Sequence, residues 1–338
     1  MEWTMKLGVL GVGRIGVMHA TFAAASPAIS EVTVFDADSD RAAVAAQQVG
    51  ARHSADLAGV LTRCDGVLVA TPTPTHPELV RAALAAGVPV LCEKPLALQP
   101  DVVRELAAAA GAAGVPLVVG FQRRFDPAVR AIREGIRSGR YGTVYLARAV
   151  AMDHAPPPLD YIAGSGGIFL DQLVHDLDAL PWLLGERVVR VQATGSVLVD
   201  PAFAAVGDVD TTAVVLTFAS GALGVLTAGR ANGGGYDNRI EISAQHASVT
   251  AGLDARTPLT SLEPGMAAPV DPYPGFLERH AAAYQAELVA FAELVAGRAE
   301  NPSPALDSLH ALEIAAACGQ SLRAGGAVVS LELAGVGA

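Results

Sequence analysis

The chain has 338 residues, of which 51% are hydrophobic and 17% charged, and its formal net charge is −11. A chain of this length can bury two hydrophobic cores, and its apolar content excludes an intrinsically disordered protein. The acidic balance argues against nucleic acid or an anionic membrane surface as the main partner.

Cysteine usage and hydropathy indicate a cytoplasmic protein. The three cysteines lie far apart and show neither metal-ligand spacing nor a disulfide framework, which fits a reducing compartment. No targeting segment precedes the first apolar strand, residues 7–10. The longest apolar region, residues 213–228, is interrupted by a turn at residues 219–221, so we expect two strands there and not a membrane span.

A glycine-rich turn, Gly11-Val12-Gly13-Arg14-Ile15-Gly16, follows the first strand and precedes a helix that runs to Ala25. In this setting the first glycine allows a tight turn, the second lets a pyrophosphate approach the backbone, and the third lets the helix pack on the strand. The phosphates would lie at the N-terminus of the helix, where free N–H groups and the helix dipole favour anions. Glycine-rich turns also occur without ligands, so the motif alone is a weak indication.

A second strand, residues 31–35, ends at Asp36, twenty positions after Gly16. An acidic side chain there can accept hydrogen bonds from both ribose hydroxyls and repels a 2′-phosphate, so the sequence predicts NAD as the cofactor. Asp38 adds to this repulsion, whereas Arg41 close by leaves NADP as the less favoured alternative.

Strands and helices continue to alternate as far as residue 121. Three further strands are expected at residues 65–70, 88–92 and 117–121, and two helices at residues 78–86 and 100–113. This alternation predicts an α/β fold with a doubly wound parallel sheet of the Rossmann type, whose ligands gather beyond the carboxyl ends of the strands.

Two loops follow strands of this sheet at those ends. Thr71-Pro72-Thr73-Pro74-Thr75-His76 is stiff and rich in hydroxyl groups, and we place it beside the nicotinamide ribose, although ordinary proline-threonine turn chemistry explains it as well. Glu93-Lys94-Pro95 presents a lysine that can hydrogen-bond a substrate hydroxyl and stabilise an alkoxide. The proline restricts the Lys94 backbone to an extended conformation. The alternative is a surface lysine before a turn.

The second half of the chain changes to mostly strands, with connections short enough for hairpins. Strands are expected at residues 143–152, 188–198, 211–218, 222–228, 239–244 and 247–251. They predict a C-terminal α+β domain with a large open, mainly antiparallel sheet, closed by helices at residues 276–296 and 307–324. We divide the chain into an NAD-binding Rossmann domain, residues 1–123, and a substrate-binding and oligomerisation domain, residues 124–338.

Apolar residues occupy both faces of the 214–216 segment in this sheet. A sheet that is apolar on both faces is covered on both faces. We therefore expect another subunit on the outer face, in a homodimer or homotetramer.

The stretch 166–178, wound as one helix, places Asp171, His175 and Asp178 along one face and leucines on the opposite face. A carboxylate one turn before an imidazole suits proton transfer, because the carboxylate favours the imidazolium and fixes the ring. A solvated polar face on an amphipathic helix is the plainer interpretation. The cofactor motifs in the first half favour the functional one.

In combination, these motifs resemble those of the Gfo/Idh/MocA oxidoreductase family, and within it most of all the inositol 2-dehydrogenases, over essentially the whole length. The resemblance rests on Gly11 to Gly16, Ala70 to His76, Glu93-Lys94-Pro95, Gly120 to Pro127, Ser165 to Asp176, Tyr284 to Gly297 and the helix from Asp307. It implies NAD-dependent oxidation of a secondary hydroxyl of a small-molecule cyclic polyol or sugar.

The resemblance also implies a catalytic trio of Lys94, Asp171 and His175. A metal site of Asp153, His154, Asp171 and His175 is not expected, because hydride chemistry needs no metal and their spacing is not a known ligand pattern. In this trio His175, oriented and made more basic by Asp171, takes the hydroxyl proton, while Lys94 stabilises the alkoxide and the carbinol hydride passes to the nicotinamide. Because the trio draws on both predicted domains, neither half should be active alone. No catalytic role falls to Asp178.

The resemblance adds substrate contacts to this trio, and the motifs above supply the cofactor contacts. The predicted substrate-binding residues are Lys94, Gln122, Arg123, His154, Asp171, His175 and Tyr236. The predicted cofactor-binding residues are Gly11, Gly13, Arg14, Ile15, Gly16, Asp36, Thr71, Pro72, Thr75, His76, Glu93 and Lys94.

Two other functions stay open at this point. Some relatives use tightly held NAD to hydrolyse glycosides through transient oxidation, which gives an NAD-dependent glycoside hydrolase as one alternative. A non-catalytic NAD-binding sensor is the other. Net accumulation of NADH with a free polyol separates the dehydrogenase from both.

Overall fold

The chain forms two compact units in the computed structural model, which describes residues 3–331. Unit 1 contains the described residues up to Phe125 together with Ala282–His310, and unit 2 contains Asp126–Ala281 together with the described residues from Ala311 onward. The predicted domains, residues 1–123 and 124–338, remain a prediction, because a compact unit need not be a functional domain.

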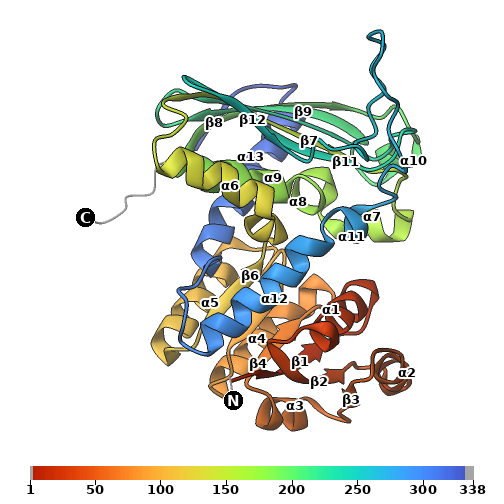
Figure 1. The fold of residues 1–338 in the computed structure, drawn as a ribbon, viewed down its shortest axis with the longest axis vertical. Coiled ribbons are helices and arrows are strands. Elements are labelled where there is room, and N and C mark those ends of the chain that lie inside the picture. Colours follow the sequence, from red (N-terminus) through yellow and green to blue (C-terminus); the bar gives the residue numbers. More distant parts are fainter. Residues whose placement is uncertain (1–2, 332–338) are drawn as a thin grey trace. The chain divides into compact units, whose positions relative to one another are not determined.

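Unit 1 is built on a six-stranded parallel sheet with the strand order β3-β2-β1-β4-β5-β6 (Figure 1). This is the order of a doubly wound dinucleotide-binding sheet, so the predicted fold of the first half is confirmed. The strands are β1 (Met5–Leu10), β2 (Ile29–Phe35), β3 (Arg52–His53), β4 (Gly66–Val69), β5 (Val90–Glu93) and β6 (Leu117–Gly120). All residues of β4 and β6 are buried, which explains their continuous apolar sequences.

Helices cover this sheet, and a segment from late in the chain completes its core. The helices are α1 (Arg14–Ala25), α2 (Ser39–Val49), α3 (Leu57–Arg63), α4 (His76–Ala85) and α5 (Pro100–Ala113), with 3-10 turns η1 (Thr73–Thr75) and η2 (Gln122–Phe125). From α12 (Ala281–Val295), the residues Leu288, Phe291 and Ala292 join the core of β1 and β2. A Cβ on Gly66 would lie 3.0 Å from the Phe291 ring, so glycine at the start of β4 makes room for that ring.

The prediction of one helix over residues 276–296 is wrong. The structure has two helices, α11 (Phe276–Arg279) and α12, because His280 between them has φ −108° and ψ 12°. Arg279 pairs at 3.1 Å with Asp126, which caps the N-terminus of α6 (Pro127–Arg137). This long-range ion pair fixes the short helix, and hydrophobic periodicity does not reveal it.

Unit 2 is built on a seven-stranded sheet with the order β12-β11-β7-β10-β9-β8-β13. Only the pair of β7 and β10 is parallel, so the predicted mainly antiparallel sheet is confirmed. The strands are β7 (Val144–Met152), β8 (Val188–Ser196), β9 (Thr211–Phe218), β10 (Leu223–Gly229), β11 (Asp237–Ala244), β12 (Ser248–Ala251) and β13 (Val329–Ser330).

Helices α6, α8 (Gly167–Asp171), α9 (Val174–Leu184) and the part of α13 (Ala305–Arg323) that follows residue 310 pack on one face of this sheet (Figure 1). The other helices of unit 2 among the described residues are α7 (Leu159–Ser165), α10 (Ala202–Ala205) and α11. The opposite face carries exposed Tyr145, Val215 and Leu223. The prediction that another subunit covers this face stays a prediction. Within residues 3–331, no helix combines the length and the hydropathy that a membrane span needs.

The stretch 166–178 is not one continuous helix. It is divided into α8, which ends at Asp171, and α9, which begins at Val174. The prediction of one continuous helix is therefore wrong, and the polar stripe of Asp171, His175 and Asp178 on it stays a prediction. The opposite stripe is confirmed, since Leu173, Leu177 and Leu180 are fully buried.

Contacts of Gln172 and Leu173 explain this interruption. The Gln172 side-chain amide donates to the carbonyl oxygens of Ala151 and Gly229, near the ends of β7 and β10, at 3.0 and 3.1 Å. The Leu173 N–H donates to the carbonyl of Ile168, five residues back, instead of the residue four back. The helix is thus broken by hydrogen bonds to strands that are distant in sequence.

Candidate active site

The glycine-rich turn between β1 and α1 has the geometry that a dinucleotide requires. Gly11 has φ +90°, and a Cβ there would lie 2.7 Å from Thr71 Cγ2 and 2.8 Å from the Ala70 carbonyl oxygen. A Cβ on Gly16 would overlap the Gly11 carbonyl oxygen, so α1 packs directly on the turn. A Cβ on Gly13 meets nothing within 4 Å, and no side chain caps α1 there. The first N–H groups of α1 are therefore accessible to a pyrophosphate.

Asp36, directly after β2, is bonded to this same turn. Its carboxylate accepts from the Val12 N–H at 2.9 Å, from the Asp38 N–H at 3.0 Å and from the Arg41 guanidinium at 2.9 Å. Burial raises the pKa of Asp36, but these hydrogen bonds outweigh burial and hold the pKa below its usual value of 3.8. The carboxylate is ionised at neutral pH, and its remaining lone pairs can accept from ribose hydroxyls.

The loop after β4 is held by its own hydroxyl groups and by His76. Thr75 Oγ1 lies 2.7 Å from Thr71 Oγ1 and 2.8 Å from the Pro72 carbonyl oxygen. His76 is buried, with Nδ1 2.9 Å from the Pro95 carbonyl oxygen and Nε2 2.8 Å from that of Thr71. Burial lowers the pKa of His76, although both carbonyls favour the charged ring. His76 therefore ties this loop to the loop after β5.

Lys94 is half-buried, follows the carboxyl end of β5 and forms a cis peptide bond with Pro95. Its backbone N–H donates to Glu93 Oε2 at 3.2 Å. The other oxygen of Glu93 lies 2.7 Å from Nε2 of His19, on α1. The predicted catalytic lysine is thus linked, through the side chain of its neighbour, to the helix that begins at the glycine-rich turn.

Gln122 and Arg123 lie in η2, directly after β6, and both are almost fully buried. Their neighbour Arg124 donates to the Asp307 carboxylate at 2.7 Å and to the Pro302 carbonyl at 3.3 Å. The predicted residues of unit 1 therefore follow the carboxyl ends of neighbouring parallel strands, where doubly wound sheets bind their ligands.

In unit 2, Asp171 at the end of α8 is the centre of a polar network. The Tyr161 hydroxyl donates to Asp171 Oδ1 at 2.7 Å, and Arg230 Nη1 donates to Asp171 Oδ2 at 2.8 Å. Arg230 is 2% exposed and also lies 3.5 Å from Asp153 Oδ2. A buried guanidinium shared by two carboxylates stabilises their ionised forms.

The other predicted residues of unit 2 lie in α9 and beside β7 and β11. His175 is in the first turn of α9 and is half-buried, and His154 after β7 is exposed, with Nδ1 3.3 Å from the Asn232 carbonyl oxygen. Tyr236 precedes β11 and contacts the His280 ring edge-to-face at 6.2 Å.

The strand register explains why these residues gather. Met152 of β7 pairs with Gly229 of β10 and with Asp237 of β11. The residues just beyond these three positions must lie at one end of three adjacent strands. Asp153, Arg230 and Tyr236 are those residues.

Comparison with known proteins identifies the family of this chain. Residues 5–121 match the model of the oxidoreductase family with an NAD-binding Rossmann fold, and residues 129–250 match the Gfo/Idh/MocA C-terminal domain. A myo-inositol dehydrogenase of Streptomyces leeuwenhoekii is 38% identical over 330 residues, which cover 96% of this chain and 100% of the relative. The chain belongs to the Gfo/Idh/MocA family.

Solved structures agree with this assignment. The myo-inositol dehydrogenase of Corynebacterium glutamicum superposes with a TM-score of 0.88 at 34% identity, covering 98% of this chain and 100% of that one. The scyllo-inositol dehydrogenase of Lactobacillus casei, with NAD(H) and scyllo-inositol bound, gives a TM-score of 0.86 at 25% identity, covering 97% and 99%. The predictions of family, of a dehydrogenase and of NAD as cofactor are confirmed.

Sequence reasoning missed two members of the Asp171 network in this Gfo/Idh/MocA protein. Arg230 directly follows the last residue of β10, so its place at a strand end was a usable indication. Tyr161 lies in a helix after the segment Ala155-Pro156-Pro157-Pro158, and neither periodicity nor spacing indicates that it contacts Asp171.

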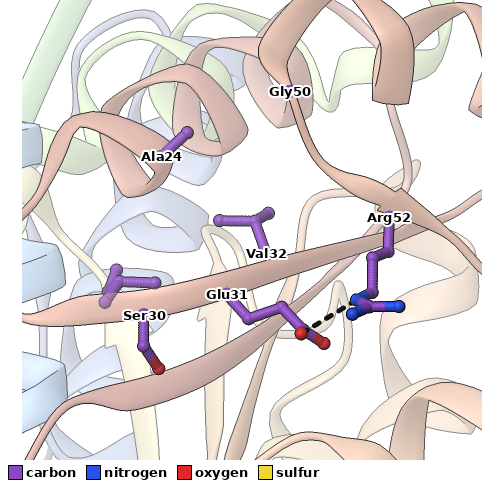
Figure 2. Close-up of a pocket in the computed structure, with 7 residues that line it drawn as sticks. Ala24, Ser30, Glu31, Val32, Gly50 and Arg52 are labelled. Atoms are coloured by element: carbon purple, nitrogen blue, oxygen red, sulfur yellow. Dashed lines mark ion pairs between the residues drawn. The ribbon is translucent and has the colours of Figure 1, made fainter.

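A hollow on unit 1 lies away from these residues (Figure 2). It is lined by Ala24, the first half of β2, Gly50 and Arg52, and Arg52 pairs with Glu31 at 2.8 Å across it. Asp36 follows the opposite end of β2. The hollow is therefore at the end of the strand that does not carry the cofactor motifs.

Proposed function

We propose that this Gfo/Idh/MocA protein oxidises a secondary hydroxyl of an inositol-like cyclic polyol to the ketone, with NAD as the oxidant. The observation that carries the proposal is the full-length similarity to inositol dehydrogenases, at 38% identity to the Streptomyces relative. A related structure that holds both NAD(H) and scyllo-inositol supports the same substrate class.

The chemistry divides between three residues of the chain. NAD, when bound at the glycine-rich turn, supplies the acceptor for the hydride of the carbinol carbon. His175 takes the proton of the hydroxyl group as general base. Lys94 donates a hydrogen bond to the same oxygen and stabilises the negative charge that develops on it.

Asp171 orients His175 and favours its charged form in this proposal. The hydrogen bonds from Tyr161 and Arg230 support that role, because they fix the carboxylate and stabilise its ionised form. Gln122, Arg123, His154 and Tyr236 are proposed to contact the other hydroxyl groups of the substrate.

The test is a panel of inositols, aldoses and amino sugars, with NADH absorbance as the readout. Net NADH formation with an inositol is the expected result. Cleavage of an aryl glycoside without net NADH would favour a glycoside hydrolase instead. NAD binding without turnover of any polyol or sugar would favour a sensor.

A further inference from the structure

Unit 1 contains a buried group of three ionisable side chains that the proposed mechanism does not use as reactants. Glu287 on α12 is 1% exposed, His19 on α1 is fully buried, and the Glu93 side chain at the end of β5 is 14% exposed. One nitrogen or oxygen atom from each lies within 4.8 Å of the others.

Two carboxyl groups this close inside a protein cannot both be ionised without a cation between them. The hydrogen-bond partners of Glu93 and Glu287 indicate which of the two carboxyl groups is charged. Glu93 accepts from the Lys94 N–H at 3.2 Å and contacts His19 Nε2 at 2.7 Å. Neither oxygen of Glu287 has a hydrogen-bond partner among the described residues. Donors stabilise a carboxylate, so Glu93 is the ionised member and Glu287 the neutral one.

The charges around Glu287 favour the same assignment. Burial raises the pKa of Glu287 well above its usual value, and the charge of Glu93 raises it further. The titratable groups that face this site are Glu93 from β5, His19 from α1 and Tyr284 from α12 itself, whose ring contacts His19 edge-to-face at 5.3 Å. Of these groups, the Glu93 carboxylate is the one whose charge raises the pKa of Glu287.

We propose that Glu287 carries a proton at neutral pH and that this keeps a second negative charge away from Glu93. Through Glu93, this buried acid pair positions the backbone of Lys94. While Glu287 is neutral, the Glu93 carboxylate keeps its contacts with His19 Nε2 and with the Lys94 N–H. Ionisation of Glu287 at high pH places a second negative charge beside Glu93 and displaces it. The positioning role rests on the proposed function of Lys94, whereas the protonation of Glu287 does not.

Protonation of Glu287 predicts the direction in which the stability of the chain changes with pH. Its pKa is raised in the folded state, so the folded chain keeps a proton that the unfolded chain has already lost. Stability from this group is complete below the unfolded-state pKa and falls as pH rises through the folded-state pKa. Unfolding at a pH between the unfolded-state and the folded-state pKa therefore releases the proton of Glu287.

The direct test compares wild type with Glu287→Gln, which is isosteric with the protonated acid. The slope of the unfolding free energy against pH gives the number of protons released, and Glu287→Gln should remove about one. Glu293→Gln is the matched control, because Glu293 lies on the same helix, is exposed and pairs with Arg298. An unchanged slope in Glu287→Gln would overturn the proposal.

Infrared spectroscopy gives a second readout that does not depend on unfolding. A carbonyl stretch of a protonated carboxyl should be present at pH 7 in wild type and in Glu293→Gln, and absent in Glu287→Gln. Binding of Zn²⁺ or Mn²⁺ to wild type but not to Glu287→Gln would make the trio a cation site and would also overturn the proposal.

The positioning role is tested by activity. Wild-type kcat should decline at alkaline pH as Glu287 ionises, and in Glu287→Gln this decline should shift upward by at least one pH unit. Glu93→Gln should lower kcat at pH 7, because the Lys94 N–H loses its carboxylate acceptor. If no polyol is oxidised, the proposed function fails, and the proton count still decides the protonation of Glu287. An alkaline limb that is identical in wild type and Glu287→Gln would refute the positioning role.

Discussion

Two carboxylic acids, the half-buried Asp171 in unit 2 and the buried Glu287 in unit 1, have opposite surroundings. Asp171 accepts hydrogen bonds from a tyrosine hydroxyl and from a buried guanidinium. Glu287 has a second carboxylate beside it and no hydrogen-bond donor among the described residues. The difference shows that hydrogen-bond donors and neighbouring charges act together with burial to set the charge of an enclosed acid. The ionised Asp171 can orient a general base, and the neutral Glu287 can retain its proton.

The largest effect on turnover is expected for the residue that Asp171 is proposed to orient, His175. His175→Ala removes the proposed general base, so turnover should fall by about 10²- to 10⁴-fold. NAD affinity should be unchanged, because the glycine-rich turn is untouched. Steady-state kinetics and NAD titration are the measurements, and His246→Ala, at an exposed histidine, is the control. Near-normal turnover in His175→Ala would contradict the mechanism.

Arg230→Met removes the guanidinium that pairs with Asp171, so Asp171, like Glu287, then lies without that cationic partner. The buried carboxylate loses its charged partner, and breaking such a pair costs about 3–5 kcal/mol of unfolding free energy. Denaturant unfolding measures this loss. Arg148→Met is the matched control, because Arg148 pairs with Glu241 at 2.9 Å on the exposed sheet face, where about 0–1 kcal/mol is expected. Equal losses of unfolding free energy in the two variants would mean that the burial of Arg230 does not determine the cost of removing it.

Asp36 is an intermediate case, a partly enclosed carboxylate with backbone donors, and its effect should be smaller. Asp36→Ala removes the acceptor for the ribose hydroxyls, and a hydrogen bond to a charged group contributes about 1.5–3 kcal/mol. The preference for NAD over NADP should therefore fall by about 10- to 100-fold. Dissociation constants for both cofactors measure it, with the exposed Asp40→Ala as control. Full retention of the preference would remove Asp36 as its cause.

Local patterns predict unit 1 well. The glycine-rich turn, Asp36 and the Lys94 loop each follow a short apolar strand, and parallel strands bring their carboxyl ends to one edge. Only nearest neighbours in the sequence are needed for that inference. In unit 2, alternation and short turns predict the hairpins β9–β10 and β11–β12, but they do not predict that β7 lies between β10 and β11.

Long-range polar contacts are what the sequence does not reveal. The break after Asp171 depends on Gln172 reaching two strand ends, and the Asp171 network depends on Arg230, 59 positions away. Glu287 was open to prediction in principle, since it is an acid between the core positions Tyr284 and Leu288 on an apolar helix. The charge state of Glu287 could not be predicted from the sequence, because it depends on Glu93, which is distant in sequence.

The origin of the unit 1 core has a consequence for the order of events during synthesis. The sheet β1 to β6 leaves the ribosome first, yet the space beside Gly66 is filled by Phe291, which is translated after the whole of residues 126–281. The N-terminal unit therefore cannot finish folding in the order in which it is made. Until α12 emerges, the apolar surface of the N-terminal unit that Phe291 later covers is a site for chaperone binding or aggregation.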